Sequence, residues 1–206
     1  MRPFFSIVMP TRNRAKTLEY AIQTALFQDF DDYEVVVSDN CSVDHTEDVV
    51  RGQQDPKVRY LRTPSPLAMS KNWEYGLSQA RGTYRLILSD DDGLLRDSLS
   101  NLHRSIRETG AKIVRWHRAQ YNWPNYSLWG LYENLLIYTK PRSESRFMPS
   151  DAIVRNAIRY LDCSDTPGLV NSAIHADVFE ELQKRTGMLI LSYSPDTCSG
   201  ITMPCL

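Results

Sequence analysis

Short apolar runs alternate with stretches of helical periodicity through the first half of the chain. Apolar runs of about four to eight residues, bounded by proline or polar residues, are typical of buried strands. Stretches in which apolar residues recur every three or four positions predict amphipathic helices. We therefore expect strands at residues 4–9, 33–39, 58–62, 84–88 and 111–116, with a helix between each strand and the next.

The sequence also signals where these helices begin and end. Asn13 precedes the first periodic stretch and belongs to the residue types that cap helix N-termini. The residues DHTE at 44–47 have the form of a capping box and predict a short second helix. Gly82 and Gly110 stand where the two following helices should end. These signals support the alternation of strands and helices.

Strands that alternate with helices predict an α/β fold with a mostly parallel central sheet and helices on both faces. Ligands of such sheets bind outside the carboxyl ends of the strands. Polar clusters at 10–14, 38–40 and 89–92 each follow an expected strand end. We therefore expect these three clusters to share one edge of the sheet.

The second half of the chain is less regular. Residues 117–148 are rich in aromatic side chains and asparagine, and patterns at 150–161, 169–174 and 177–185 predict a helix, a strand and a helix. We expect residues 117–206 to form a smaller, irregular part of the same domain as residues 1–116. Because the sequence stops soon after "YSPDTCSGI", we expect the natural protein to continue beyond it.

Composition narrows the classes of partner. The formal net charge of −1 over 206 residues argues against nucleic acid as a ligand. No apolar run approaches the roughly 20 residues that span a bilayer, which leaves only peripheral association with a membrane. The four cysteines show no CxxC spacing, and this favours reduced thiols and a cytoplasmic location.

Three consecutive aspartates, Asp90, Asp91 and Asp92, follow the expected strand at 84–88. Carboxylates this close repel one another unless a cation lies between them. One interpretation is a solvated acidic turn before the next helix. The other is a site for Mg²⁺ or Mn²⁺, because Asp90 and Asp92, two positions apart, can face one ion while Asp91 turns away.

Other charged residues follow strand ends as well. Asp39 ends the strand at 33–39, where it either forms an Asx-turn or accepts a hydrogen bond from a nucleobase N–H. Arg12, Arg14 and Lys71 are cations that either face a diphosphate or lie on the solvated surface. The residues alone leave both alternatives open.

The order of these motifs resembles a known family. "FSIVMPTRNRAKTLEYAIQTALFQDFDDYEVVVSDNCSVDHTEDVV" resembles the start of a family 2 glycosyltransferase of the GT-A fold, and "SKNWEYGLSQARGTYRLILSDDDGLL" continues the likeness through a DxD strand end. The resemblance covers roughly the first hundred residues. It implies a nucleotide-diphospho-sugar donor, with UDP or dTDP as nucleotide, and a divalent cation, Mn²⁺ or Mg²⁺.

The resemblance also implies roles for individual residues. Asp90 and Asp92 would be the outer, metal-binding residues of the DxD motif, with Asp92 the more direct ligand. Asp39 would contact the base, and Asp91 the ribose or sugar. The full set of expected nucleotide-binding residues is Thr11, Asn13, Arg14, Asp39, Lys71 and Asp91. The sequence departs from the family pattern at Ser89, where many members carry aspartate, and at "PSPLAM", which replaces a usual Asn-x-Gly.

The resemblance further implies an inverting transfer to a hydroxyl of a saccharide or lipid-linked acceptor. Asp196 in "SPDTCSG" lies where the family carries its catalytic base, although a Pro-Asp turn is an equal alternative. The aromatic stretch 121–138 would line the acceptor site or pack as core and lid. Residues 1–116 would then bind the nucleotide sugar and residues 117–206 the acceptor.

Two other functions are compatible with an α/β fold of this kind. A sugar nucleotidyltransferase would need a glycine-rich loop after the first strand, and "MPTRNRAKT" contains no glycine. A non-catalytic nucleotide-sugar-binding module of a larger assembly remains the alternative to an enzyme.

Overall fold

The computed structural model describes residues 2–121, 136–137, 146–160, 165–190 and 203–205. Their elements, in chain order, are β1 (Phe5–Thr11), α1 (Ala15–Leu26), β2 (Tyr33–Asp39), α2 (Thr46–Gly52), β3 (Val58–Arg62), α3 (Met69–Gln79), β4 (Tyr84–Ile87), α4 (Ser98–Thr109), β5 (Ile113–Arg115), β6 (Gln120–Tyr121), β7 (Leu136–Ile137), α5 (Ser150–Tyr160), β8 (Ser172–His175), α6 (Ala176–Thr186) and the 3-10 turn η1 (Met203–Cys205).

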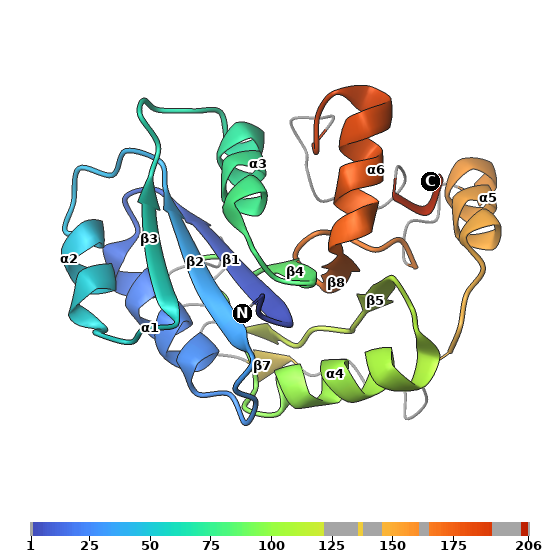
Figure 1. The fold of residues 1–206 in the computed structure, drawn as a ribbon, viewed down its shortest axis with the longest axis horizontal. Coiled ribbons are helices and arrows are strands. Elements are labelled where there is room, and N and C mark those ends of the chain that lie inside the picture. Colours follow the sequence, from blue (N-terminus) through green and yellow to red (C-terminus); the bar gives the residue numbers. More distant parts are fainter. Residues whose placement is uncertain (1, 122–135, 138–145, 161–164, 191–202, 206) are drawn as a thin grey trace.

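The central sheet has six strands in the order β3-β2-β1-β4-β8-β5 (Figure 1). The strands β3, β2, β1 and β4 run parallel, whereas β8 is antiparallel to both of its neighbours, β4 and β5. The expected α/β fold with a mostly parallel sheet is therefore confirmed. Strand β8, which comes from the irregular second half of the chain, completes the sheet that the first half begins.

Helices cover both faces of this sheet (Figure 1). Alternate residues of β1 and β2 point to opposite faces. On one face Phe5, Ile7 and Val35 pack with apolar side chains of α1, α2 and α4. On the other face Val8 and Val36 pack with apolar side chains of α3 and α6. Because both faces are buried, the strands read as nearly continuous apolar runs in the sequence.

Strand β1 extends two residues beyond its expected end, through Pro10 to Thr11. The carbonyl of Val8 accepts from Leu88 on the β4 side, and that of Thr11 accepts from Asn40 on the β2 side. Backbone groups of alternate residues in a strand point to the same neighbouring strand, so those of Pro10, like those of Val8, point toward β4. The pairing of β4 with β1 has already ended at Val8. The missing N–H of Pro10 therefore costs no bond to β2.

The cap of α1 differs from the expected one, whereas Asp44, the first residue of the expected capping box, does contact the start of α2. The side chain of Asn13 does not cap α1; its Oδ1 accepts from the backbone N–H of Val43 instead. Asp44 caps both helices, because its carboxylate accepts from the backbone N–H groups of Ala15 (3.1 Å) and Thr46 (3.1 Å). Burial alone would raise the pKa of Asp44, but a hydrogen bond from the Thr46 hydroxyl, together with the two backbone bonds, outweighs it and lowers the pKa.

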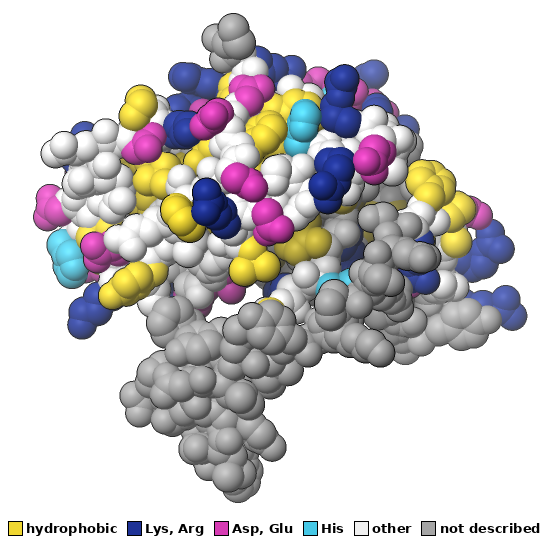
Figure 2. Space-filling model, turned by 90° about the horizontal axis from the view of Figure 1, so that it is seen from below, with side chains coloured by type: hydrophobic (Ala, Val, Ile, Leu, Met, Phe, Trp, Pro, Cys, Tyr) yellow, Lys and Arg dark blue, Asp and Glu magenta, His cyan; other side chains and the backbone are white. Residues whose placement is uncertain are grey.

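Acidic and basic side chains are interspersed over the face shown in Figure 2. This distribution agrees with the formal net charge of −1. In the part of the chain that the structure describes, none of the helices combines the length and the apolar character that a bilayer crossing requires.

Candidate nucleotide site at the carboxyl edge of the sheet

The three polar clusters meet at the carboxyl edge of β1, β2 and β4, as the strand order predicts. Thr11 lies beside Asp39 in the register of β1 and β2. The backbone N–H of Asn40 donates to the carbonyl of Thr11 at 2.9 Å. The hydroxyl of Thr11 donates to Oδ2 of Asp90 at 2.7 Å. Thr11 thus connects the loop after β2 with the acidic loop after β4.

The three aspartates of the acidic loop differ in their surroundings. Burial raises the pKa of Asp90, and the charge of Asp91 raises it further against the opposing hydrogen bond from Thr11. Burial also raises the pKa of Asp92, again with Asp91 adding to the effect. Asp91 itself is partly exposed and forms an ion pair with Arg14 at 3.0 Å. The two outer carboxylates are thus the ones whose negative charge is costly, and a bound cation would offset that cost.

This arrangement fits one part of a divalent metal site. Within the described ranges, no three histidine, cysteine, aspartate or glutamate side chains gather into a group able to hold a metal ion. A Mg²⁺-type site, however, usually takes only one or two carboxylates, with substrate phosphates and water supplying the other oxygens. Asp90 and Asp92 fit such an open site and do not form a closed one.

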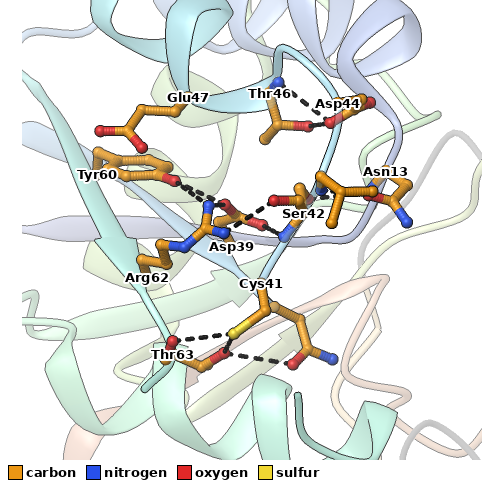
Figure 3. Close-up of polar contacts among 12 residues, drawn as sticks. Asn13, Asp39, Cys41, Ser42, Asp44, Thr46, Glu47, Tyr60, Arg62 and Thr63 are labelled. Carbon is orange, nitrogen blue, oxygen red and sulfur yellow. Dashed lines mark hydrogen bonds and ion pairs between the residues drawn. The ribbon is translucent and has the colours of Figure 1, made fainter. Parts of the chain in front are cut away.

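The carboxylate of Asp39 lies at the centre of a hydrogen-bond cluster between the ends of β2 and β3 (Figure 3). Its Oδ1 accepts from the backbone N–H of Ser42 at 2.9 Å. Its Oδ2 accepts from the hydroxyl of Tyr60 at 2.6 Å and from the guanidinium of Arg62 at 3.0 Å. The side chain of Asp39 is 0% exposed. The bond from Ser42 reaches three residues along the chain, one more than in the expected Asx-turn, and contact of Asp39 with a nucleobase stays a prediction.

Sequence reasoning missed Tyr60 and Arg62. Burial and the hydrogen bond to Asp39 raise the pKa of Tyr60 to about 12, so this phenol is a donor at neutral pH. Both residues lie on β3 two positions apart, and Arg62 is the register partner of Asp39. Residues two positions apart on a strand point to the same face, and β3 ends next to β2. Two side chains with polar ends at such positions near the end of β3 are the sequence signal that could have identified Tyr60 and Arg62 as neighbours of Asp39.

The loops after β1 and β2 are fastened to each other. The backbone N–H of Asn13 donates to the hydroxyl of Ser42 at 2.9 Å, and Oδ1 of Asn13 accepts from Val43 at 2.8 Å. Asn13 and Cys41 both have a φ of 55°, a left-handed conformation that is uncommon for residues other than glycine. These bonds hold Asn13 at the same edge as Asp39 and Arg14.

Lys71 lies in the first turn of α3, next to this edge. Its ammonium group pairs with Glu74 at 2.7 Å. The neighbouring Asn72 fixes the start of α3 to the end of β2, because it donates to the carbonyl of Ser38 (3.1 Å) and accepts from the hydroxyl of Ser38 (2.7 Å). Asn72 is a third residue that sequence reasoning missed. Lys71 therefore has a fixed backbone position and a side chain that is 51% exposed.

Two expectations lie outside the described residues. Asp196, the expected catalytic base, belongs to the segment 191–202. Most of the aromatic stretch 121–138 also falls outside the described ranges. Both remain predictions.

Comparisons with known proteins agree with this architecture. Among curated proteins, a GalNAc(5)-diNAcBac-PP-undecaprenol beta-1,3-glucosyltransferase of Campylobacter jejuni is 39% identical over 114 residues, which are 54% of this chain and 37% of the relative. The abequosyltransferase RfbV of Salmonella typhimurium is 31% identical over 134 residues, 57% of this chain and 40% of the relative. The matched region thus spans well under half the length of either relative.

Solved structures share the fold. The structure of S. aureus TarS 1–349 in complex with UDP-GlcNAc superposes with a TM-score of 0.66 at 17% identity, covering 95% of this chain and 52% of TarS. The mannosyltransferase PcManGT of Pyrobaculum calidifontis, in complex with GDP-Man and Mn²⁺, superposes with a TM-score of 0.62 at 19% identity, covering 96% of this chain and 50% of PcManGT. The model of the family named "Glycosyl transferase family 2" matches residues 6–168, most of the chain, and with this match the protein belongs to that family.

Proposed function

We propose that this chain carries the donor-binding part of an inverting glycosyltransferase, which moves a sugar from a nucleotide-diphospho-sugar to an acceptor hydroxyl. The hydrogen bond between Thr11 and Asp90 carries this proposal, because it joins the edge of the sheet at Asp39 to the acidic loop. The names of the relatives support it, since the Campylobacter jejuni relative is a glucosyltransferase and TarS was solved with UDP-GlcNAc.

In this proposal Asp39 accepts from a ring N–H of the base, with uracil or thymine as the expected base. Arg14 and Lys71 are the cations available to the diphosphate, and both are about half exposed at the edge of the sheet. Thr11 and Asn13 position the surrounding loops, and Asp91 contacts the ribose or sugar. The ion pair between Arg14 and the partly exposed Asp91 costs little to exchange, because surface ion pairs contribute about 0–1 kcal/mol.

The proposed cofactor is Mn²⁺ or Mg²⁺, held by Asp90 and Asp92. When bound, it would neutralise charge that develops on the leaving diphosphate. The raised pKa of both carboxylates supports this assignment, because a bound cation would offset the cost of their negative charges. The Mn²⁺ in the PcManGT structure is a further support from within the same fold.

The acceptor side rests on the resemblance alone. Inversion needs a base that takes the proton from the attacking hydroxyl on the face of the sugar opposite the diphosphate. We assign this role to Asp196. The acceptor we propose is a saccharide or a lipid-linked saccharide, as the name of the undecaprenol-dependent relative suggests. A cytoplasmic location with peripheral membrane contact suits such an acceptor, and Cys41 is a free thiol in keeping with it.

Calorimetry with UDP and dTDP, with Mn²⁺ and after addition of EDTA, tests the donor site. We expect binding that weakens strongly once the metal is removed. Affinity that EDTA leaves unchanged would contradict the metal assignment, and failure to bind either nucleotide would contradict the donor site. The alternative is a non-catalytic nucleotide-sugar-binding module of a larger assembly. Nucleotide release from a bound donor, measured with and without candidate acceptors, separates the two functions.

A further inference from the structure

The carboxylate of Asp39 is covered completely, so that a nucleobase can reach it only if a covering group moves. Three groups donate hydrogen bonds to it: the backbone N–H of Ser42, the phenol of Tyr60 and the guanidinium of Arg62. Figure 3 shows Tyr60 and Arg62 approaching Asp39 from β3. The proposed contact between base and Asp39 therefore requires a rearrangement that the sequence does not reveal.

Of these three groups, Arg62 is the one that can leave at low cost. The N–H of Ser42 is part of the backbone turn after β2. The ring of Tyr60 is packed under the guanidinium of Arg51, 5.4 Å from the ring centroid. The side chain of Arg62, in contrast, is 43% exposed. A displaced guanidinium regains water, whereas a displaced phenol or backbone turn would disturb the packing around it.

Arg62 also occupies the position that a base would need. Its Nη1 donates to Oδ2 of Asp39 at 3.0 Å, and its Nη2 donates to the carbonyl of Ser42 at 2.9 Å. A uracil ring offers one N–H donor, at N3, which could replace the Nη1 donor on Asp39. Guanine and thymine also offer a ring N–H. The N3 of cytosine carries no hydrogen and would place an acceptor against the carboxylate.

We propose that Arg62 competes with the nucleobase for Asp39 and thereby weakens the binding of bases that carry a ring N–H. The inference rests on the proposed function, because it assumes that Asp39 is the acceptor for the base. In the free protein Arg62 holds Asp39 covered. A base with a ring N–H displaces the guanidinium, whereas a base without one leaves it in place and gains no contact with Asp39.

The test compares UDP with CDP, which carry the same charge and differ at the base edge. Arg62→Ala should bind UDP about three- to tenfold more tightly than the wild type, the factor that matches the net value of one hydrogen bond. CDP affinity should change much less, so the preference for UDP over CDP should rise. Because both ligands lose the same electrostatic attraction to Arg62, the ratio of the UDP affinity to the CDP affinity reports on Asp39 alone.

Two further variants serve as controls for the effect of Arg62→Ala. Arg51→Ala removes an exposed arginine from the same Tyr60 ring but leaves Asp39 covered, so both affinities should stay unchanged. Arg62→Lys replaces the two separate guanidinium donors with one ammonium nitrogen. Its UDP affinity should lie between those of the wild type and Arg62→Ala, and it provides a reading if the alanine variant does not fold.

Three results separate failure of this inference from failure of the function. A UDP affinity that falls in Arg62→Ala, with CDP unchanged, would show that Arg62 holds the base itself. A preference for UDP over CDP that does not change would also overturn the competition. A wild type that binds none of UDP, dTDP and GDP would contradict the donor site and not Arg62 in particular.

Discussion

Glu34 gives a stability prediction whose size and pH dependence both follow from the structure. It lies on β2 and is 7% exposed. Its Oε1 accepts from the hydroxyl of Ser6 at 2.7 Å and from the backbone N–H of Arg81 at 2.7 Å. Its Oε2 accepts from the guanidinium of Arg59 at 2.6 Å. One carboxylate thus ties together β1, β2, β3 and the turn before β4, at the end of the sheet opposite the candidate site.

The substitution Glu34→Gln keeps the shape but removes the charge. The amide oxygen can still accept from Ser6 and Arg81, while the amide nitrogen must face the donor of Arg59. The loss of a charged hydrogen bond costs about 1.5–3 kcal/mol, and breaking a fully buried pair costs about 3–5 kcal/mol. Because Arg59 is 22% exposed and keeps a bond to the carbonyl of Gln79, we expect about 2–3 kcal/mol of destabilisation at pH 7.

The pH dependence has a defined sign. Burial by itself would raise the pKa of Glu34, but the hydrogen bonds from Ser6, Arg59 and Arg81 outweigh it and leave the pKa below the ordinary 4.5. The folded state therefore binds the proton more weakly than the unfolded state. The stabilisation is fully present above pH 4.5 and is lost as the pH falls through the folded-state pKa.

Urea unfolding of the wild type and Glu34→Gln over a range of pH measures this effect. The gap between the two free energies of unfolding should be constant near neutral pH and narrow below pH 4.5. The control is Glu47→Gln, whose carboxylate pairs with Arg51 on the exposed surface of α2 and should cost less than about 0.5 kcal/mol. A Glu34→Gln protein as stable as the wild type at pH 7, or a gap that persists under acid, would refute the reasoning.

Three further predictions concern the metal ligands, the catalytic base and the packing of the sheet. Asp92→Asn should lower Mn²⁺-dependent UDP affinity more than Asp91→Asn, as calorimetry with and without EDTA can show, and equal losses would contradict the assignment. Asp196→Asn should lower turnover about 100-fold or more at nearly unchanged donor affinity, and full activity would remove it as the base. Gly82→Ala would place a Cβ 2.5 Å from a backbone nitrogen of β1 and should cost about 1–3 kcal/mol in thermal or urea unfolding. Gly52→Ala, with no atom within 4 Å of its Cβ, is the matched control and should be close to neutral.

The sequence by itself determined the order of strands and helices and the edge at which the polar clusters meet. Apolar runs closed by polar residues mark buried parallel strands, and parallel strands place their carboxyl ends at one edge. For this reason Thr11, Asp39 and Asp90 could be expected together, and the bond from Thr11 to Asp90 joins them as expected. The same local patterns located the helices to within a few residues of their bounds.

Only the tertiary structure decided which groups each of these residues contacts. Tyr60 and Arg62 cover Asp39 from β3, and Asp44 caps α1 from a loop 29 residues away. Strand β8 enters the sheet antiparallel to β4, although its apolar pattern is the same as that of a parallel strand. Periodicity in a sequence reports which face of an element is buried. Hydrogen-bond partners and strand direction depend on which distant segments pack against that face, and this information is not contained in any local stretch of the chain.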